Sequence, residues 1–212
     1  SAGDQLWHED SASIFGVAEA NDQFGYALAV GDAGNDGYDD LLVGIPNQAV
    51  GGDAEAGVVA LIRGGGSGLS AVGNQRWHED RNGTPGSAQP GDHFGAAVGF
   101  ADVTGDGRDD LIAGIPGQNF TPADVGAVLM ARGHSTGGFA SSGSKWFHQT
   151  LTGIAGDGAQ TNDRFGAALY RSEGQWAVRL AGSPSLLYAF AGSDVRCAQS
   201  GGIGGEVVGC RL

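Results

Sequence analysis

Short apolar segments, separated by polar turns rich in glycine, follow one another along this chain. Each segment is rich in aliphatic or aromatic residues and is bounded by Gly, Pro, Asn or Asp, which is typical of β-strands. In the first part of the chain they are 24–30 (FGYALAV), 40–46 (DLLVGIP), 57–64 (GVVALIRG) and 74–80 (NQRWHED). No periodic segment of helix length lies between them. The pattern predicts four short antiparallel strands.

The same four segments are then repeated. The second copies are 94–100 (FGAAVGF), 110–116 (DLIAGIP), 126–133 (GAVLMARG) and 144–150 (SKWFHQT). Single residues keep this register: Trp7 recurs as Trp77 and Trp146, at steps of 70 and 69 residues. A fixed period of this kind indicates stacked or radial repeats. Four strands in each repeat predict an all-β fold of about three four-stranded antiparallel β-propeller blades.

The repeats also predict the domain organisation. We expect a single propeller domain over residues 1–212, with blade units at about 15–80, 81–150 and 151–212 and a leading strand at 5–10. Propellers typically close with four to eight blades, so three blades leave sheet edges and blade faces open. We therefore expect the ring to be closed by dimerisation or by further blades in a longer protein.

The composition agrees with this fold and narrows the choice of partners. Glycine supplies 41 of the 212 residues, which suits tight turns and disfavours helices. Three glycines near strand starts are expected where neighbouring backbone leaves no room for a Cβ: Gly25, Gly57 and Gly126. The formal net charge of -13 disfavours nucleic acid and anionic membranes as partners and favours cations. No apolar run approaches the ~20 residues of a transmembrane segment.

Two cysteines, Cys197 and Cys210, lie near the end of the chain. An even pair that closes a short loop is most simply a disulfide, which adds on the order of 3 kcal/mol of stability. A disulfide predicts a secreted, extracellular protein. Two free thiols in a cytosolic protein, or a metal site, are the alternatives.

These features together resemble a known repeat. Phe-Gly opens one strand and Gly-Ile-Pro closes the next, as in the FG-GAP repeat of integrin α-subunit propellers and of many secreted bacterial proteins. The motif WHED ahead of DQFG and DHFG is similar to actinobacterial members. The resemblance covers essentially the whole chain. In the third unit it rests on Phe165–Gly166 and on AGSP at 181–184, because that unit lacks the acidic loop.

In the FG-GAP repeat the acidic loop after the first strand binds Ca²⁺, a hard cation that takes six to eight oxygen ligands. The resemblance implies side-chain ligands at Asp102, Thr104, Asp106 and Asp110, with the backbone carbonyl of Arg108. In the first unit it implies Asp32, Asp36 and Asp40, with the carbonyl of Tyr38. We expect one or two structural ions and no metal in the third unit.

Both loops depart from the family pattern at the third position, where Asn or Asp is usual. Thr104 stands there in the second loop and Gly34, which has no side chain, in the first. We therefore expect the second site to bind Ca²⁺ more tightly. Asp39 and Asp109 are expected to face solvent or to pair with arginines. The alternative for each loop is an acidic turn held by Asx-type hydrogen bonds without metal.

The functional prediction is a secreted, calcium-stabilised binding module for protein or carbohydrate ligands at its loop faces, without catalysis. No catalytic residue is assigned, because the polar residues that stand out repeat in register rather than forming one cluster. The alternative is the propeller part of a secreted hydrolase, acting on an ester, a phospholipid or a glycan. Residues 133–137 (GHSTG) fit the G-x-S-x-G pattern, but they follow a strand as a turn, where a nucleophile Ser135 is not expected.

Overall fold

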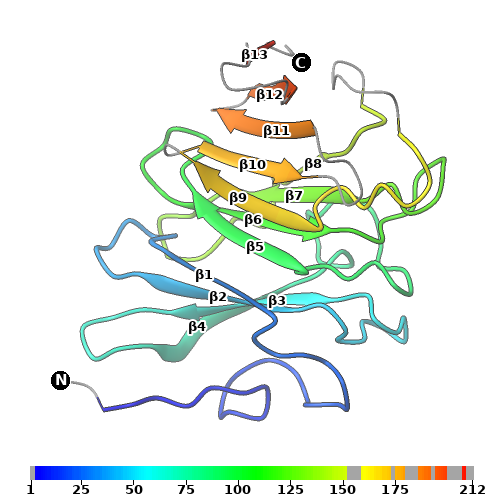
Figure 1. Cartoon of the computed structure of the whole chain (residues 1–212). Helices are drawn as coiled ribbons and strands as arrows, with labels where there is room; N and C mark the ends of the chain where they lie inside the picture. Colours follow the sequence, from blue (N-terminus) through cyan, green and yellow to red (C-terminus); the bar gives the residue numbers. More distant parts are fainter. Residues whose placement is uncertain are drawn as a thin grey trace.

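The structure, a computed structural model, describes residues 3–151, 159–172, 175–179, 186–191, 194–199 and 207–208. Within these residues every regular element is a β-strand, and the strands form three antiparallel sheets. Figure 1 shows the sheets one above the other, in chain order from blue to orange. The predicted all-β fold is confirmed. The described part of the chain also contains no helix that could cross a membrane.

The first two sheets have four strands each. The first contains β1 (Ala27–Gly31), β2 (Asp40–Ile45), β3 (Val58–Arg63) and β4 (Ser70–Trp77). The second contains β5 (Ala97–Ala101), β6 (Asp110–Ile115), β7 (Ala127–Ala131) and β8 (Lys145–Phe147). Each strand pairs with the next one along the chain, which is the arrangement of a propeller blade.

The third sheet differs from the expected four strands. It contains β9 (Ala168–Ser172), β10 (Gln175–Arg179), β11 (Leu186–Ala191), β12 (Asp194–Gln199) and β13 (Val207–Val208). Ser172 pairs directly with Gln175, so only two residues separate β9 from β10, where the other sheets have an acidic loop between their first two strands. The fifth strand is the two-residue β13, which pairs with the outer edge of β12.

The predicted leading strand at residues 5–10 is absent, because this segment forms coil and turn. Gln5 holds it beside the start of β4 through its side chain. The Nε2 of Gln5 donates to the carbonyl of Leu69 at 2.9 Å, and its Oε1 accepts from the Leu69 N–H at 2.9 Å. The side-chain amide thus satisfies the backbone groups that a strand ladder would have used.

The Phe-Gly pairs join each sheet to the one before it. Phe94 forms an isolated parallel bridge with Gly57, and Phe165 forms one with Gly126. An ideal Cβ on Gly57 would lie 2.3 Å from the backbone nitrogen of Phe94, so only glycine fits there. The same crowding occurs at Gly126. The expectation for Gly25 is wrong within the described residues, where no atom lies within 4 Å of its ideal Cβ.

The main hydrophobic core lies between the first and second sheets. Val98 and Phe100 of β5 are buried in it together with Leu42 of the first sheet. Their counterparts on β1, Leu28 and Val30, are 61% and 67% exposed. The described sheets do not close into a ring, and β1 therefore presents an open apolar face.

Candidate functional site

Two acidic loops connect the first two strands of the first and second sheets. Loop one is residues 32–40 and loop two is residues 102–110, each including the aspartate that begins the following strand. The N–H of Asp32 donates to Oδ2 of Asp109 at 3.0 Å, and the N–H of Asp109 donates to the carbonyl of Asp32 at 3.1 Å. The loops are therefore neighbours. Asp109 binds the adjacent loop, which differs from its expected solvent-facing or arginine-paired position.

Loop one is shaped by hydrogen bonds from its own backbone. The carboxylate of Asp32 accepts from the N–H groups of Asp36 at 3.0 Å and Gly37 at 2.8 Å. Asp36 accepts from the N–H of Tyr38 at 3.0 Å. These are Asx-type bonds, which hold tight turns. The predicted ligands thus lie in one loop, with carboxylate oxygens already engaged by N–H groups.

Arg63, at the end of β3, joins two of the predicted ligands of loop one. Its Nε lies 2.9 Å from Oδ1 of Asp40, and a terminal guanidinium nitrogen lies 2.9 Å from Oδ2 of Asp36. The Asp40 side chain is fully buried, and a buried carboxylate needs such a partner. A metal ion in loop one would therefore compete with the guanidinium of Arg63.

Loop two has the same backbone scaffold. Asp102 accepts three hydrogen bonds, from the N–H groups of Gly105, Asp106 and Gly107, at 2.7 to 2.9 Å. Asp106 pairs with Arg108 at 2.8 Å. In loop one, Arg63 pairs with both Asp36 and Asp40. In loop two, Arg108 pairs with Asp106 alone, so the last carboxylate, Asp110, has no arginine partner among the described residues.

That last carboxylate, Asp110, is buried and accepts only backbone hydrogen bonds, from Val103, Thr104 and Gly133, at 2.8 to 2.9 Å. Burial raises the pKa of Asp110 above its ordinary value, although these three bonds act in the opposite direction. The side-chain hydroxyl of Thr104 is buried and makes no hydrogen bond. An unpaired buried hydroxyl is costly, and it is also an oxygen that a hard cation can use.

The donor set of loop two fits Ca²⁺ better than that of loop one. Loop two offers three carboxylates, the unpaired Thr104 hydroxyl and the Arg108 carbonyl, whereas loop one has no side chain at Gly34 and holds Arg63. Within the described residues, no three His, Cys, Asp or Glu side chains stand close enough to share a metal ion. Binding in loop two therefore requires its Asp side chains to move closer together.

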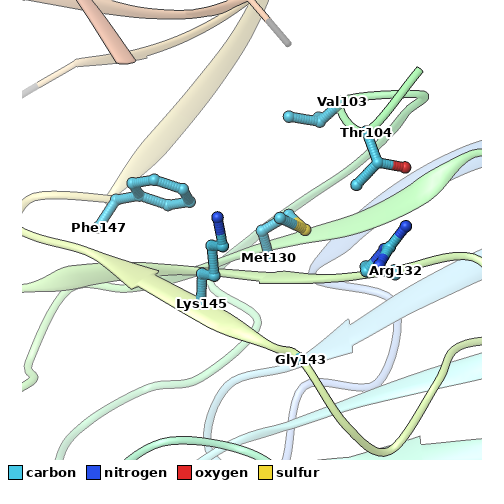
Figure 2. Close-up of a pocket in the computed structure, with 7 residues that line it drawn as sticks. All are labelled: Val103, Thr104, Met130, Arg132, Gly143, Lys145 and Phe147. Carbon is cyan, nitrogen blue, oxygen red and sulfur yellow. The ribbon is translucent and has the colours of Figure 1, made fainter. Parts of the chain in front are cut away.

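A surface pocket of about 360 Å³ borders loop two. Figure 2 shows Thr104 and Arg132 on one side of it and Lys145 and Phe147 on the other. In the first unit the equivalent space is filled, because Gly137 lies against Gly34, within 3.1 Å of its ideal Cβ. The pocket gives ligands a route from solvent to the side of loop two, lined by two cationic side chains.

The turn at residues 133–137 has no nucleophile elbow. It follows β7 and is closed by hydrogen bonds from the His134 N–H to the Gly138 carbonyl and from the Gly137 N–H to the His134 carbonyl, both 2.8 Å. The His134 ring is bonded to the Thr136 hydroxyl at 2.9 Å. Within the described residues no histidine is bonded to Ser135. The turn therefore lacks an activated nucleophile.

Two pairs of buried acids escaped the sequence analysis. Glu9 and Asp22 are 3% and 4% exposed, and Glu79 and Asp92 are 1% and 0% exposed. Both pairs link the WHED motif to the residue two positions before Phe-Gly, and the third unit has Gln149 in place of the glutamate. This exchange of Glu for Gln at one repeat position could have indicated a buried, protonated glutamate, because glutamine has the shape of a protonated glutamate and is neutral.

Burial and then the charge of Asp22 together raise the pKa of Glu9 to about 7. Burial, reinforced by Asp92, likewise raises the pKa of Glu79. Each aspartate also accepts a backbone N–H, that of Glu19 or of Gln89. In both pairs burial therefore favours the protonated form of the glutamate.

The predicted disulfide cannot be followed in the structure. Cys197 lies in β12, and Cys210 lies outside the described residues. In the third unit only two residues separate β9 from β10, where the other units have their acidic loops.

Comparisons with known proteins identify the repeats. Residues 24–62 and 94–129 match the FG-GAP repeat. Both matches run from the Phe-Gly pair through the acidic loop and into the third strand of a sheet. They therefore cover the elements that form the two loops and the contacts between the sheets.

Three relatives illustrate the range of proteins with similar sequence. Phosphatidylinositol-glycan-specific phospholipase D of Bos taurus is 33% identical over 121 residues, which is 57% of this chain and 14% of that protein. Integrin alpha pat-2 of Caenorhabditis briggsae is 36% identical over 96 residues, 45% of this chain and 7% of that protein. Integrin alpha-V of Gallus gallus is 29% identical over 120 residues, 54% of this chain and 10% of that protein. The matched region is thus a small part of each relative.

Proposed function

We propose, from the premise that this chain is an integrin-like FG-GAP repeat protein, that it is a secreted, non-catalytic propeller module that binds protein or carbohydrate ligands at its loop faces. The observation that carries the proposal is a constant framework with different loops. The N–H groups of Gly57 and Gly126 donate to the carbonyls of Gln48 and Gln118 in the first and second units. The loops that these bonds close differ in sequence and length.

The two loops also differ in what they present. In the first unit, Val50 and Asp53 form a small antiparallel bridge. In the second, Phe120 stacks on the His148 ring with centroids 3.9 Å apart and meets Trp146 edge to face. Variable loops on a rigid scaffold are common sites of recognition. We therefore place ligand binding on these loops.

The direct test is a search for binding together with a search for turnover. The purified chain is applied to a printed glycan array and to a displayed peptide library, and in parallel to chromogenic esters, phosphodiesters and glycosides. We expect binding that weakens in a Phe120→Ala variant and no turnover. Turnover that disappears in Ser135→Ala would contradict the proposal and favour the hydrolase alternative, which the phospholipase relative keeps in view.

Calcium is the second part of the proposal. We assign it first to loop two, with Asp102, Thr104, Asp106 and Asp110 as side-chain ligands and the carbonyl of Arg108. The unpaired Thr104 hydroxyl supports this assignment. Loop one, with Asp32, Asp36, Asp40 and the Tyr38 carbonyl, binds more weakly because Arg63 already pairs with two of its carboxylates. The ion would hold the loop in one conformation.

The calcium proposal predicts that Ca²⁺ raises the melting temperature and that EGTA reverses the rise. Thr104→Val keeps the shape of the side chain and removes the hydroxyl. It should weaken the Ca²⁺ affinity measured by calorimetry by about tenfold, the effect of losing one good ligand. The melting temperature without calcium should not fall. Thr84→Val is the control, since Thr84 lies outside both loops. No calorimetric signal with Ca²⁺ in the unaltered chain would contradict the assignment.

Two further features complete the proposal. The pair Cys197 and Cys210 forms the disulfide of a secreted protein, which mass spectrometry of the alkylated, unreduced chain tests. The ring is closed by a second copy of the chain, and the open face of β1 supports this association.

A further inference from the structure

A second surface cavity, of about 470 Å³, lies near the end of β4. It is lined by Phe15, Gly16, Asn74, Gln75, Arg76, His78 and Arg81. Trp77, between these residues, pairs with Val59, whereas the start of β4 pairs with Arg63 next to loop one. The cavity is therefore at the opposite end of the sheet from the acidic loops, and the calcium assignment does not involve it.

The arginines of this cavity have no acidic partner. The ion pairs of the described residues involve Arg63, His93, Arg108 and Arg132, and neither Arg76 nor Arg81 approaches a carboxylate within 4.0 Å. The chain carries 24 acidic residues against 11 lysines and arginines. Two neighbouring arginines left unpaired in such an acidic protein are unusual, because acidic partners are abundant.

The structure holds both guanidinium groups in place by other means. Arg81 lies over the Trp77 ring, 4.4 Å from its centroid, and donates to the carbonyl of Arg76 at 2.8 Å. Arg76 donates to the carbonyl of Ala49 at 3.3 Å. The Nε atoms of both arginines and the Nδ1 of His78 are buried without a hydrogen-bond partner. The site is thus preorganised, and three of its nitrogen atoms have no partner within the described part of the protein.

Burial lowers the pKa of Arg76, of Arg81 and of His78, and the charge of Arg76 lowers that of His78 further. The acidic influences on the cavity are Glu9, on Arg76, and Asp80, on His78. The pKa of Glu9 is raised to about 7, so near neutral pH this carboxyl only partly offsets the charge of Arg76. A partly buried guanidinium without a counter-ion is an unfavourable arrangement that an anionic ligand would relieve.

The repeats show that these charges are not needed for the fold. The turn after the tryptophan is the same in all three units, where Ser11, Arg81 and Leu151 each donate their N–H to the carbonyl of the preceding histidine, at 2.9 to 3.1 Å. The position of Arg76, two residues before that histidine, is likewise occupied by Leu6 and Trp146. The arginine pair therefore occurs in one unit of three, as expected of a ligand site rather than a structural element.

We propose that this cavity binds an acidic saccharide, with Arg76 and Arg81 holding its carboxylate, sulfate or phosphate group. A volume of about 470 Å³ accepts a sugar-sized ligand. Phe15, which is 56% exposed, supplies an apolar surface for the sugar ring. Asn74 and Gln75 also line the cavity, with the Nδ2 of Asn74 donating to the Ala71 carbonyl and the Oε1 of Gln75 accepting from the Trp77 ring. The inference deepens the proposed binding function, on which its choice of a carbohydrate rests.

The test is isothermal titration of the full chain with D-glucuronate and glucose 6-sulfate, with D-glucose and inorganic sulfate as reference ligands. We expect both acidic sugars to bind more tightly than either reference, and the affinity to fall as salt is raised. Arg76→Gln and Arg81→Gln should each weaken binding by about tenfold or more, because each removes a charge-assisted hydrogen bond. Arg164→Gln, at an exposed arginine of the third unit, is the matched control and should bind normally.

Arg76→Gln is the more informative variant. The Arg76 side chain makes one hydrogen bond in the described structure, so the melting temperature of this variant should stay near that of the unaltered chain. Equal binding of glucose and glucuronate, or normal binding by both variants, would overturn the arginine site. Sulfate that binds as tightly as glucose 6-sulfate would overturn the saccharide assignment. If neither sugar binds while the chain still captures other glycans or peptides, this inference fails and the proposed binding function stands.

Discussion

At the scale of single residues, the buried pair of Glu9 and Asp22 makes folding stability depend on pH. The pKa of Glu9 is raised from 4.5 to about 7, chiefly by burial and then by Asp22, while Arg76 lowers it and Asp10 raises it. A carboxyl whose pKa is raised on folding stabilises the native state fully below its unfolded pKa, and this contribution is lost as pH rises toward the folded pKa. The window therefore runs from about pH 4.5 to about pH 7.

We expect Glu9→Gln to remove this pH dependence, because glutamine keeps the shape of the protonated acid and has no proton to lose. The unaltered chain should lose up to about 3 kcal/mol of unfolding free energy across the window relative to the variant, measured by urea denaturation at several pH values. Glu19→Gln, at an exposed glutamate, is the control. Parallel stability curves for the Glu9 variant and the unaltered chain would show that Glu9 ionises normally in the folded protein.

At the scale of strands and loops, the contact between sheets depends on glycine. Gly95 has φ +85°, and an ideal Cβ there would lie 2.7 Å from the carbonyl oxygen of Val58 in the first sheet. Gly91 has a similar φ of +83°, but no atom lies within 4 Å of its ideal Cβ. The two positions therefore share the backbone strain and differ only in the closeness of the neighbouring sheet.

Alanine at either position should cost about 1 to 2 kcal/mol for the left-handed conformation. Gly95→Ala should cost about 1 to 3 kcal/mol more, because its Cβ pushes the second sheet away from the first. Chemical denaturation of the two variants gives the difference directly. Equal losses would mean that the sheets are not packed as closely as the structure has them.

Most of the fold at this scale could be predicted from sequence, because strand patterns and the Phe-Gly register are local signals that repeat. The pairing of Arg63 with Asp36 and Asp40 could not, since it joins residues 27 and 23 positions apart and any of several carboxylates could have met that arginine. The bond from Asp109 to Asp32 spans 77 positions. The first contact depends on the choice of partner within one unit and the second on how one unit packs on the next, and a repeat pattern specifies neither.

At the scale of the whole molecule, the first sheet has an open face on β1. The equivalent face of the second sheet, on β5, is covered by the first sheet. Leu28 and Val30 are exposed on β1, while Val98 and Phe100 are buried against the first sheet. The N–H of Phe94 donates to Ala56 at 2.8 Å, a bond between units that Phe24 lacks within the described residues. The open face therefore has the chemistry to receive another blade, and a second copy of the chain can supply one.

The proposed association predicts a mass near twice 21.3 kDa in light scattering. Leu28→Glu places a charge on the open face and should give a monomer, because a carboxylate buried between two sheets has no partner. Val72→Glu adds the same charge at a side chain that is 83% exposed on β4 and should leave the mass unchanged. Gly25→Ala should also dissociate the pair, since a blade packed there would crowd its Cβ as the first sheet crowds that of Gly95. A monomeric mass for the unaltered chain would contradict this association and favour closure of the ring by further blades of a longer polypeptide.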